Sequence, residues 1–258
     1  MNAFLRIVSA SILTATAAVA SFAQQSNTDR LRDKGWEFEI RTGVNIGGTT
    51  PLPIPAEVRE IIEYNPNLNG ILEVAISKWF LPHDGFGVMT GLRLEQKGME
   101  TTAAVKNYHM TLTQQGTAMT GNWTGVVRTA YSAASVTVPL LLAYNFHDRG
   151  KMYIGFFGGY NIAGDFSGDV YDGYFRQGSP IGEKIVFSDE DRTPYSFKDA
   201  LRSYEIGFQF GGGVKVYRNF GLFADFKYGF NNIFKKGFDA VAFGMYPAYI
   251  GTGFSYVF

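Results

Sequence analysis

Residues 36–46 read WEFEIRTGVNI, and their apolar and polar side chains alternate. Most even positions carry apolar side chains, whereas Glu37, Glu39, Arg41 and Asn45 take odd positions. A period of two places these two kinds of side chain on opposite faces of a β-strand. The alternation persists for about 12 residues, longer than a usual strand of about 5 to 6 and close to the 9 to 11 or so of a tilted membrane-spanning strand. The stretch therefore predicts a strand that crosses a membrane.

The same alternation returns along the chain and predicts seven further strands. Their ranges are 68–80, 86–98, 132–146, 152–164, 203–217, 221–231 and 245–258. An even number of long alternating strands is typical of an outer-membrane barrel, because closure of the barrel pairs every backbone group. The predicted fold class is therefore all-β, an eight-stranded antiparallel transmembrane β-barrel.

The connections between these strands predict the orientation of the barrel. Three connections are short turns, LPHDG at 81–85, HDRGK at 147–151 and RNF at 218–220, and the others are much longer. Short turns are typical of the periplasmic side and long loops of the extracellular side. Both termini are therefore expected on the periplasmic side.

The composition favours strands and excludes several classes of function. The 258 residues include 31 glycines, 23 phenylalanines and 15 tyrosines. Basic and acidic residues number 23 each, so no net field attracts nucleic acid. Cysteine is absent, which excludes disulfides, thiolate chemistry and a lipidated cysteine. We expect no cofactor, no metal ion and no nucleic-acid partner.

The first 25 residues, MNAFLRIVSASILTATAAVASFAQQ, have the pattern of a secretory signal. Arg6 precedes an apolar stretch at 7–20, and Ser21 and Ala23 fit the −3 and −1 positions of a cleavage site. The apolar stretch is shorter than the 20 or so residues that a membrane-spanning helix needs. We expect a signal peptide at 1–23, cleaved after Ala23, and an outer-membrane barrel domain at 24–258.

The polar face of the strands predicts a charged lumen. Its residues are Arg41, Glu73, Arg93, Glu95, Lys97, Glu205, Lys215, Asp225 and Lys227. Arg41, Glu73 and Arg93 lie at similar heights on three consecutive strands, where opposed side chains approach to about 5 Å. We therefore expect Glu73 to lie between the two arginines, with Asp225 and Lys227 nearby.

The chain ends on the alternating strand YIGTGFSYVF at 249–258. Its aromatic residues Phe254, Tyr256 and Phe258 resemble the signal by which the outer-membrane barrel assembly machinery recognises its clients. In a soluble sheet the same residues would lie on an unpaired edge, which is an aggregation hazard. The expected partners are thus this machinery and the lipid of the outer membrane.

Four segments together resemble the PorT-like outer-membrane β-barrel proteins of the Bacteroides group. They are LRLEQKGM at 92–99, SVTVPLLLAYNF at 135–146, SYEIGFQFGGGVKV at 203–216 and FADFKYGFNNI at 223–233. Pro139 matches a proline that such proteins carry in this strand. The resemblance implies the barrel fold, and it implies a porin-like protein or a component of a secretion machinery.

No cluster of residues predicts an enzyme. The histidines are His83, His109 and His147. The first and third fall in periplasmic turns and His109 in the second long loop, so no two meet at one rim, as a catalytic triad would require. Glu37 and Glu39 point the same way, and we interpret them as ion-pair partners of Lys215 rather than as an acid and a base.

Two long connections have patterns of their own. After Pro55, the residues Val58, Ile61 and Ile62 have helical spacing and predict a short amphipathic helix over the barrel mouth, as a cover or a lid. The connection at 165–202 is rich in carboxylates without the spacing of a calcium loop, and it is expected to be a solvated acidic loop.

The predicted function is that of a small structural or ligand-binding and partner-binding membrane protein. A protein or small molecule would bind at its extracellular loops, where barrels usually bind. The alternatives are a porin-like channel for small solutes and a component of an outer-membrane secretion machinery. Eight strands enclose only enough room for side chains, which disfavours the channel.

Overall fold

A computed structural model describes residues 32–51, 54–81, 85–114, 117–146, 149–179, 181–188, 192–238, 240 and 243–258. The expected signal peptide and its cleavage site lie outside these residues, as do His83 and His147 in the short turns. Within the described residues, no helix is long and apolar enough to cross a membrane.

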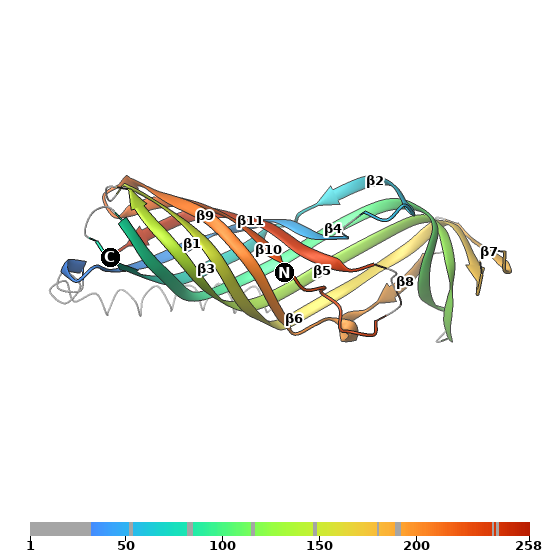
Figure 1. Ribbon diagram of the computed structural model, residues 1–258. Helices are drawn as coiled ribbons and strands as arrows, with labels where there is room; N and C mark the ends of the chain where they lie inside the picture. Colours follow the sequence, from blue (N-terminus) through green and yellow to red (C-terminus); the bar gives the residue numbers. More distant parts are fainter. Residues whose placement is uncertain are drawn as a thin grey trace.

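Eight strands form a closed antiparallel barrel in the described part of the chain (Figure 1). They are β1 (Trp36–Pro51), β3 (Asn69–Trp79), β4 (Gly85–Gln114), β5 (Thr117–Phe146), β6 (Gly150–Gln177), β9 (Tyr204–Tyr217), β10 (Phe220–Gly229) and β11 (Met245–Val257). Each strand pairs with the next in this order, and β1 pairs with β11 to close the ring. The predicted fold class and strand number are confirmed.

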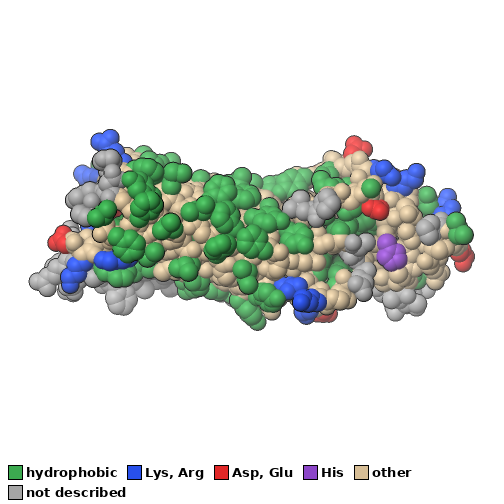
Figure 2. Space-filling view, viewed as in Figure 1, with side chains coloured by type: hydrophobic (Ala, Val, Ile, Leu, Met, Phe, Trp, Pro, Cys, Tyr) green, Lys and Arg blue, Asp and Glu red, His purple; other side chains and the backbone are tan. Residues whose placement is uncertain are grey.

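The period of two sorts the side chains of the barrel between lipid and lumen. Leu140 is 68% exposed, whereas its neighbour Leu141 is 1% exposed. Outward residues of this kind form the broad hydrophobic surface over one half of the molecule in Figure 2. In the same half of β4, the inward-facing Arg93 is fully buried.

Pro139 lies in β5 with its side chain buried on the inner face. The β4–β5 ladder runs to Thr90↔Leu140 and resumes at Arg93↔Thr137 in the same register. The ladder is thus interrupted beside the proline, which has no N–H to donate. Its carbonyl accepts a hydrogen bond from the Thr90 hydroxyl at 2.7 Å.

Three strands are about twice as long as the sequence predicts. β4, β5 and β6 have 30, 30 and 28 residues, so each continues far beyond the 9 to 11 or so that cross a membrane. Residues 99–131, expected as a long loop, belong mostly to the outer ends of β4 and β5. In Figure 1 these ends project well past the barrel.

The helix expected after Pro55 is wrong. Val58, Ile61 and Ile62 lie in the strand β2 (Val58–Asn65), which pairs with β4 through two register irregularities. Beyond Glu95 the neighbouring β3 no longer pairs with β4, so β2 covers an edge that would otherwise be open. β-branched side chains favour this extended form.

The connection at 165–202 is only partly the solvated loop that was expected. It contains the outer end of β6, β7 (Lys184–Phe187), β8 (Thr193–Ser196) and the 3₁₀ helix η1 (Lys198–Ala200). β7 and β8 both pair with β6. Phe166, Val170 and Phe175 are buried, while Asp169 pairs with Arg128 and Arg192.

Candidate functional site

The middle of the lumen is built on the row Arg41, Glu73 and Arg93, which stand opposite one another on β1, β3 and β4. All three side chains are fully buried. Arg93 Nε donates to Glu73 Oε2 at 2.9 Å, and Arg93 also donates to Gln209 at 3.1 Å. The three residues stand in the register that the sequence predicts, and Arg93 and Glu73 form an ion pair.

Arg41 makes its closest ion pair elsewhere. Its Nε donates to Glu39 Oε2 at 2.9 Å, and a second nitrogen donates to the Tyr153 hydroxyl at 3.1 Å. Glu39 is the nearest carboxylate on the same face of β1, two residues away. Glu73 thus lies between the two arginines in register, while the closest ion pairs are Arg93–Glu73 and Arg41–Glu39.

Near the periplasmic end, Lys151 forms ion pairs with Glu37 and Glu39 of β1. Its Nζ lies 2.8 Å from Glu37 Oε1 and 2.8 Å from Glu39 Oε2. The partner predicted for this pair, Lys215, is half-buried and lines a small pocket beside them. The sequence missed Lys151 because it stands at the end of the turn HDRGK, yet it is already an inward residue of β6.

Glu95 is the centre of a second charged layer, farther from the periplasm. Its oxygens lie 2.6 Å from Lys227 Nζ and 3.3 Å from Lys97 Nζ. Lys97 in turn pairs with Glu205 at 2.7 Å, and Thr137 donates to Glu95 at 3.0 Å. These buried charges compensate one another, as desolvated ions must.

Asp225 lies between the two charged layers. Its carboxylate is 4.0 Å from Arg93 and 3.9 Å from Lys227. Neither of its oxygens has a hydrogen-bond partner among the described residues, and the same holds for Glu73 Oε1. The structure thus places Asp225 and Lys227 close to the row, as the sequence predicts.

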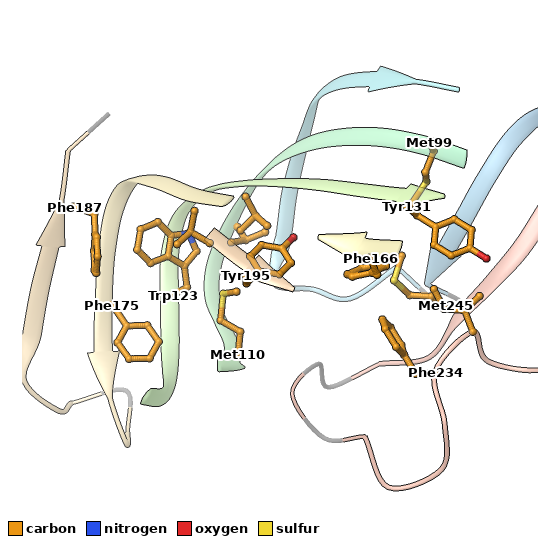
Figure 3. Close-up of a cluster of buried hydrophobic side chains, with 14 of the residues drawn as sticks. Met99, Met110, Trp123, Tyr131, Phe166, Phe175, Phe187, Tyr195, Phe234 and Met245 are labelled. Atoms are coloured by element: carbon orange, nitrogen blue, oxygen red, sulfur yellow. The ribbon is translucent and has the colours of Figure 1, made fainter. Parts of the chain in front are cut away.

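Beyond the charged layers the interior becomes apolar (Figure 3). The buried residues of this outer core are Met99, Val105, Met110, Trp123, Val127, Tyr131, Ala133, Phe166, Val170, Phe175, Phe187, Tyr195, Ile233, Phe234 and Met245. Trp123 packs edge-on against Phe187 with ring centroids 5.4 Å apart. Little in the sequence predicts this core, because most of its residues lie in stretches that read as long loops.

A cavity of about 370 Å³ lies between the outer core and β2. Its walls come from the outer end of β1, from β2, β4, β5, β6 and β8, and from Phe243 and the first residues of β11. Among the described residues, none that lines the cavity is charged. Ile54 and Ile61 line the cavity and are also exposed, so its mouth opens to the outside beside β2.

Three tyrosines and four threonines line this cavity, and of the tyrosines Tyr64 is exposed whereas Tyr108 and Tyr195 lie deeper. The Tyr195 hydroxyl lies 2.7 Å from Thr129 Oγ1 and donates to the Arg128 carbonyl at 3.0 Å. The hydroxyl of Tyr108 has no hydrogen-bond partner within the described part of the chain, and its ring packs against Phe243 at 5.7 Å. Burial raises the pKa of Tyr108 and Tyr195, so both are uncharged at neutral pH.

The C-terminal aromatics lie on the outer face of β11. Phe254 is exposed, and the Tyr256 ring packs against Phe220 and Phe258 at 5.0 and 4.9 Å. The Phe258 amide donates to the Phe38 carbonyl at 3.0 Å. The last residue is therefore paired with β1 at the closure of the barrel.

The model of the outer membrane protein beta-barrel domain matches residues 22–235. The chain belongs to this family, whose name places it in the bacterial outer membrane. A comparison with curated proteins found no match.

Ail and OprG are among the solved structures that are similar to this chain. Ail, the attachment invasion locus protein of Yersinia pestis, solved with the heparin analogue sucrose octasulfate, is 10% identical, with 86% of this chain and 97% of that chain covered and a TM-score of 0.37. OprG from Pseudomonas aeruginosa is 12% identical, with 87% and 97% covered and a TM-score of 0.34. Similarity at this level says nothing of what this chain binds.

The structure offers no grouping of catalytic or metal-binding side chains in its described residues. His109 is exposed on β4, opposite Asn122 on β5. No three His, Cys, Asp or Glu side chains in the described ranges are placed to hold a metal ion. What the arrangement does provide is a charged layer that fills the lumen and an apolar cavity beyond it.

Proposed function

We propose that this protein is a closed outer-membrane barrel that works by binding a ligand or partner with its extracellular half. The observation that carries the proposal is that paired charged side chains fill the lumen. Among them, Arg41, Glu73 and Arg93 have no solvent exposure. An eight-stranded barrel is just wide enough for side chains to fill it. A lumen filled in this way conducts no solute, and this disfavours the porin-like alternative.

The extracellular half supplies the binding surface. The long outer ends of β4, β5 and β6 carry a buried core of their own, and such a core holds a surface in a fixed shape. A chain that served only as a membrane anchor would need no such structure. The proposal involves no chemical step.

Liposome swelling tests the closed lumen. Liposomes that contain the purified protein are transferred to isotonic solutions of small sugars, and swelling reports entry of the sugar. We expect swelling no faster than in protein-free liposomes, with a large porin as the positive control. Swelling well above the protein-free rate would overturn the proposal in favour of a channel.

Three finer assignments belong to the same proposal. The four segments that resemble PorT-like proteins support membership of that group and, with it, a link to a secretion machinery. The pattern around Ala23 supports cleavage of a signal peptide there. The outward aromatics Phe254, Tyr256 and Phe258 support recognition by the barrel assembly machinery, and the charged lumen supports a structural role for its nine predicted residues.

A further inference from the structure

We infer that the cavity beside β2 binds one small, uncharged and mostly apolar molecule that carries a single hydrogen-bonding group. The inference rests on the proposed function, since it names the class of ligand that the extracellular half takes.

The size of the cavity is that of a ligand site. Protein interiors pack with few voids larger than a water molecule, whereas this cavity measures about 370 Å³. Pockets that hold small ligands measure about 300 to 1,000 Å³. A cavity of this size, open to the outside at Ile54 and Ile61, leaves apolar wall in contact with water, and an apolar molecule would release that water.

The wall selects an apolar and uncharged molecule. Its aromatic members include Phe166, Phe197 and Phe243, and its methionines are Met99, Met110 and Met245. Methionine side chains are flexible and polarizable, so they adapt to the shape of an apolar ligand. None of the lining residues in the described part of the chain carries a charge, and a charged ligand would therefore lose its hydration without gaining a partner from them.

Tyr108 provides the place for the polar group. The Tyr195 and Thr129 hydroxyls already bond to each other, and Tyr195 also donates to a backbone carbonyl. Within the described part of the chain the Tyr108 hydroxyl has no such partner, and it lines the cavity. A half-buried hydroxyl without a partner gains from a ligand that supplies one.

The methionines allow a direct test. The protein is labelled with ¹³C-methyl methionine, placed in nanodiscs and titrated with 1-naphthol and with naphthalene. We expect saturable shifts at Met99, Met110 and Met245 with both probes. Met89, buried at the barrel end of β4, should not shift, and Met152, exposed on the outer face of β6, reports partition of the probe into lipid.

Two variants and one control locate the binding. Ala103 lines the cavity, and A103F should fill it and abolish the saturable shifts, whereas A104F, on the opposite face of the same strand, should leave them unchanged. Y108F should weaken the binding of 1-naphthol by about three- to tenfold, because one hydrogen bond is lost. The binding of naphthalene should not change. Met119 packs against the outer core without lining the cavity, and an unchanged Met119 resonance shows that the outer half of each variant is folded.

The outcomes separate this inference from the function on which it rests. Shifts at Met152 alone, or saturable shifts at the cavity methionines that persist in A103F, would overturn the cavity as a ligand site even if the lumen is closed. An equal fall in affinity for 1-naphthol and naphthalene in Y108F would overturn the hydrogen bond to Tyr108. Rapid liposome swelling would overturn the proposed function whatever the probes do.

Discussion

The two halves of the molecule use the same strands with opposite patterns. On the inner face of β4, Arg93, Glu95 and Lys97 are followed directly by Met99 and, farther on, Val105, and all five are buried. In the membrane half most apolar side chains face lipid and the charges face inward, beside a small buried cluster that includes Met89 and Leu141. In the extracellular half the larger apolar cluster faces inward and no lipid covers the outer face. The difference shows that the surrounding solvent, lipid or water, decides which face of a strand is apolar.

The largest expected effect comes from the outer core. W123A removes a fully buried indole, and such changes cost about 3 to 5 kcal/mol. We expect proteases to cleave the outer ends of β4 to β6 in this variant, while the barrel half still resists unfolding by SDS. W36A, which removes a partly exposed tryptophan at the periplasmic end, is the control and should change neither property. If W123A loses both the protease resistance of the outer half and the SDS resistance of the barrel half, the two halves unfold as one cooperative unit.

The second prediction concerns Glu73. E73A removes the closest carboxylate of the buried Arg93 and leaves it only Asp225 at 4.0 Å, and breaking a buried ion pair costs about 3 to 5 kcal/mol. E73Q should cost clearly less, because the amide oxygen still accepts a hydrogen bond from Arg93. Urea unfolding in detergent measures both. Equal midpoints for the two variants would contradict this prediction, because they would show that the hydrogen bond kept by the glutamine contributes nothing to stability.

The smallest effect on stability is expected at the C-terminus. Deletion of Phe258 removes one backbone hydrogen bond to Phe38, worth about 1 kcal/mol, so the refolded barrel should unfold almost as the wild type does. In cells the same deletion should sharply reduce the amount in the outer membrane. A normal amount there would refute the role of Phe258 in assembly.

Much of the barrel could be predicted from the sequence because the period of two is strong where lipid lies on one side. The outer ends of β4 to β6 could not, since residues 99–131 are rich in threonine, alanine and glycine and lack long apolar side chains on the outer face. β2 was predicted as a helix because spacing within eight residues does not report an open edge on a neighbouring strand.

The sequence predicts which charged residues face the lumen better than it predicts which of them form ion pairs. Alternation alone places Arg41, Glu73 and Arg93 on inward faces, and the short turn between β3 and β4 sets the register of Glu73 and Arg93. Which cation faces which carboxylate depends on the reach of side chains across the lumen, and sequence spacing does not contain this distance. Lys151 therefore took the place expected for Lys215.

One pair of substitutions tests the two environments most directly. Glu95 and Glu100 lie five positions apart on β4; Glu95 is buried between two lysines, whereas Glu100 pairs with Arg128 at the surface. The free energy of unfolding, measured in urea for E95A and E100A, should fall by about 3 to 5 kcal/mol for E95A and by less than about 1 for E100A. Similar small losses for both would mean that water screens the lumen charges, and this would contradict a closed barrel.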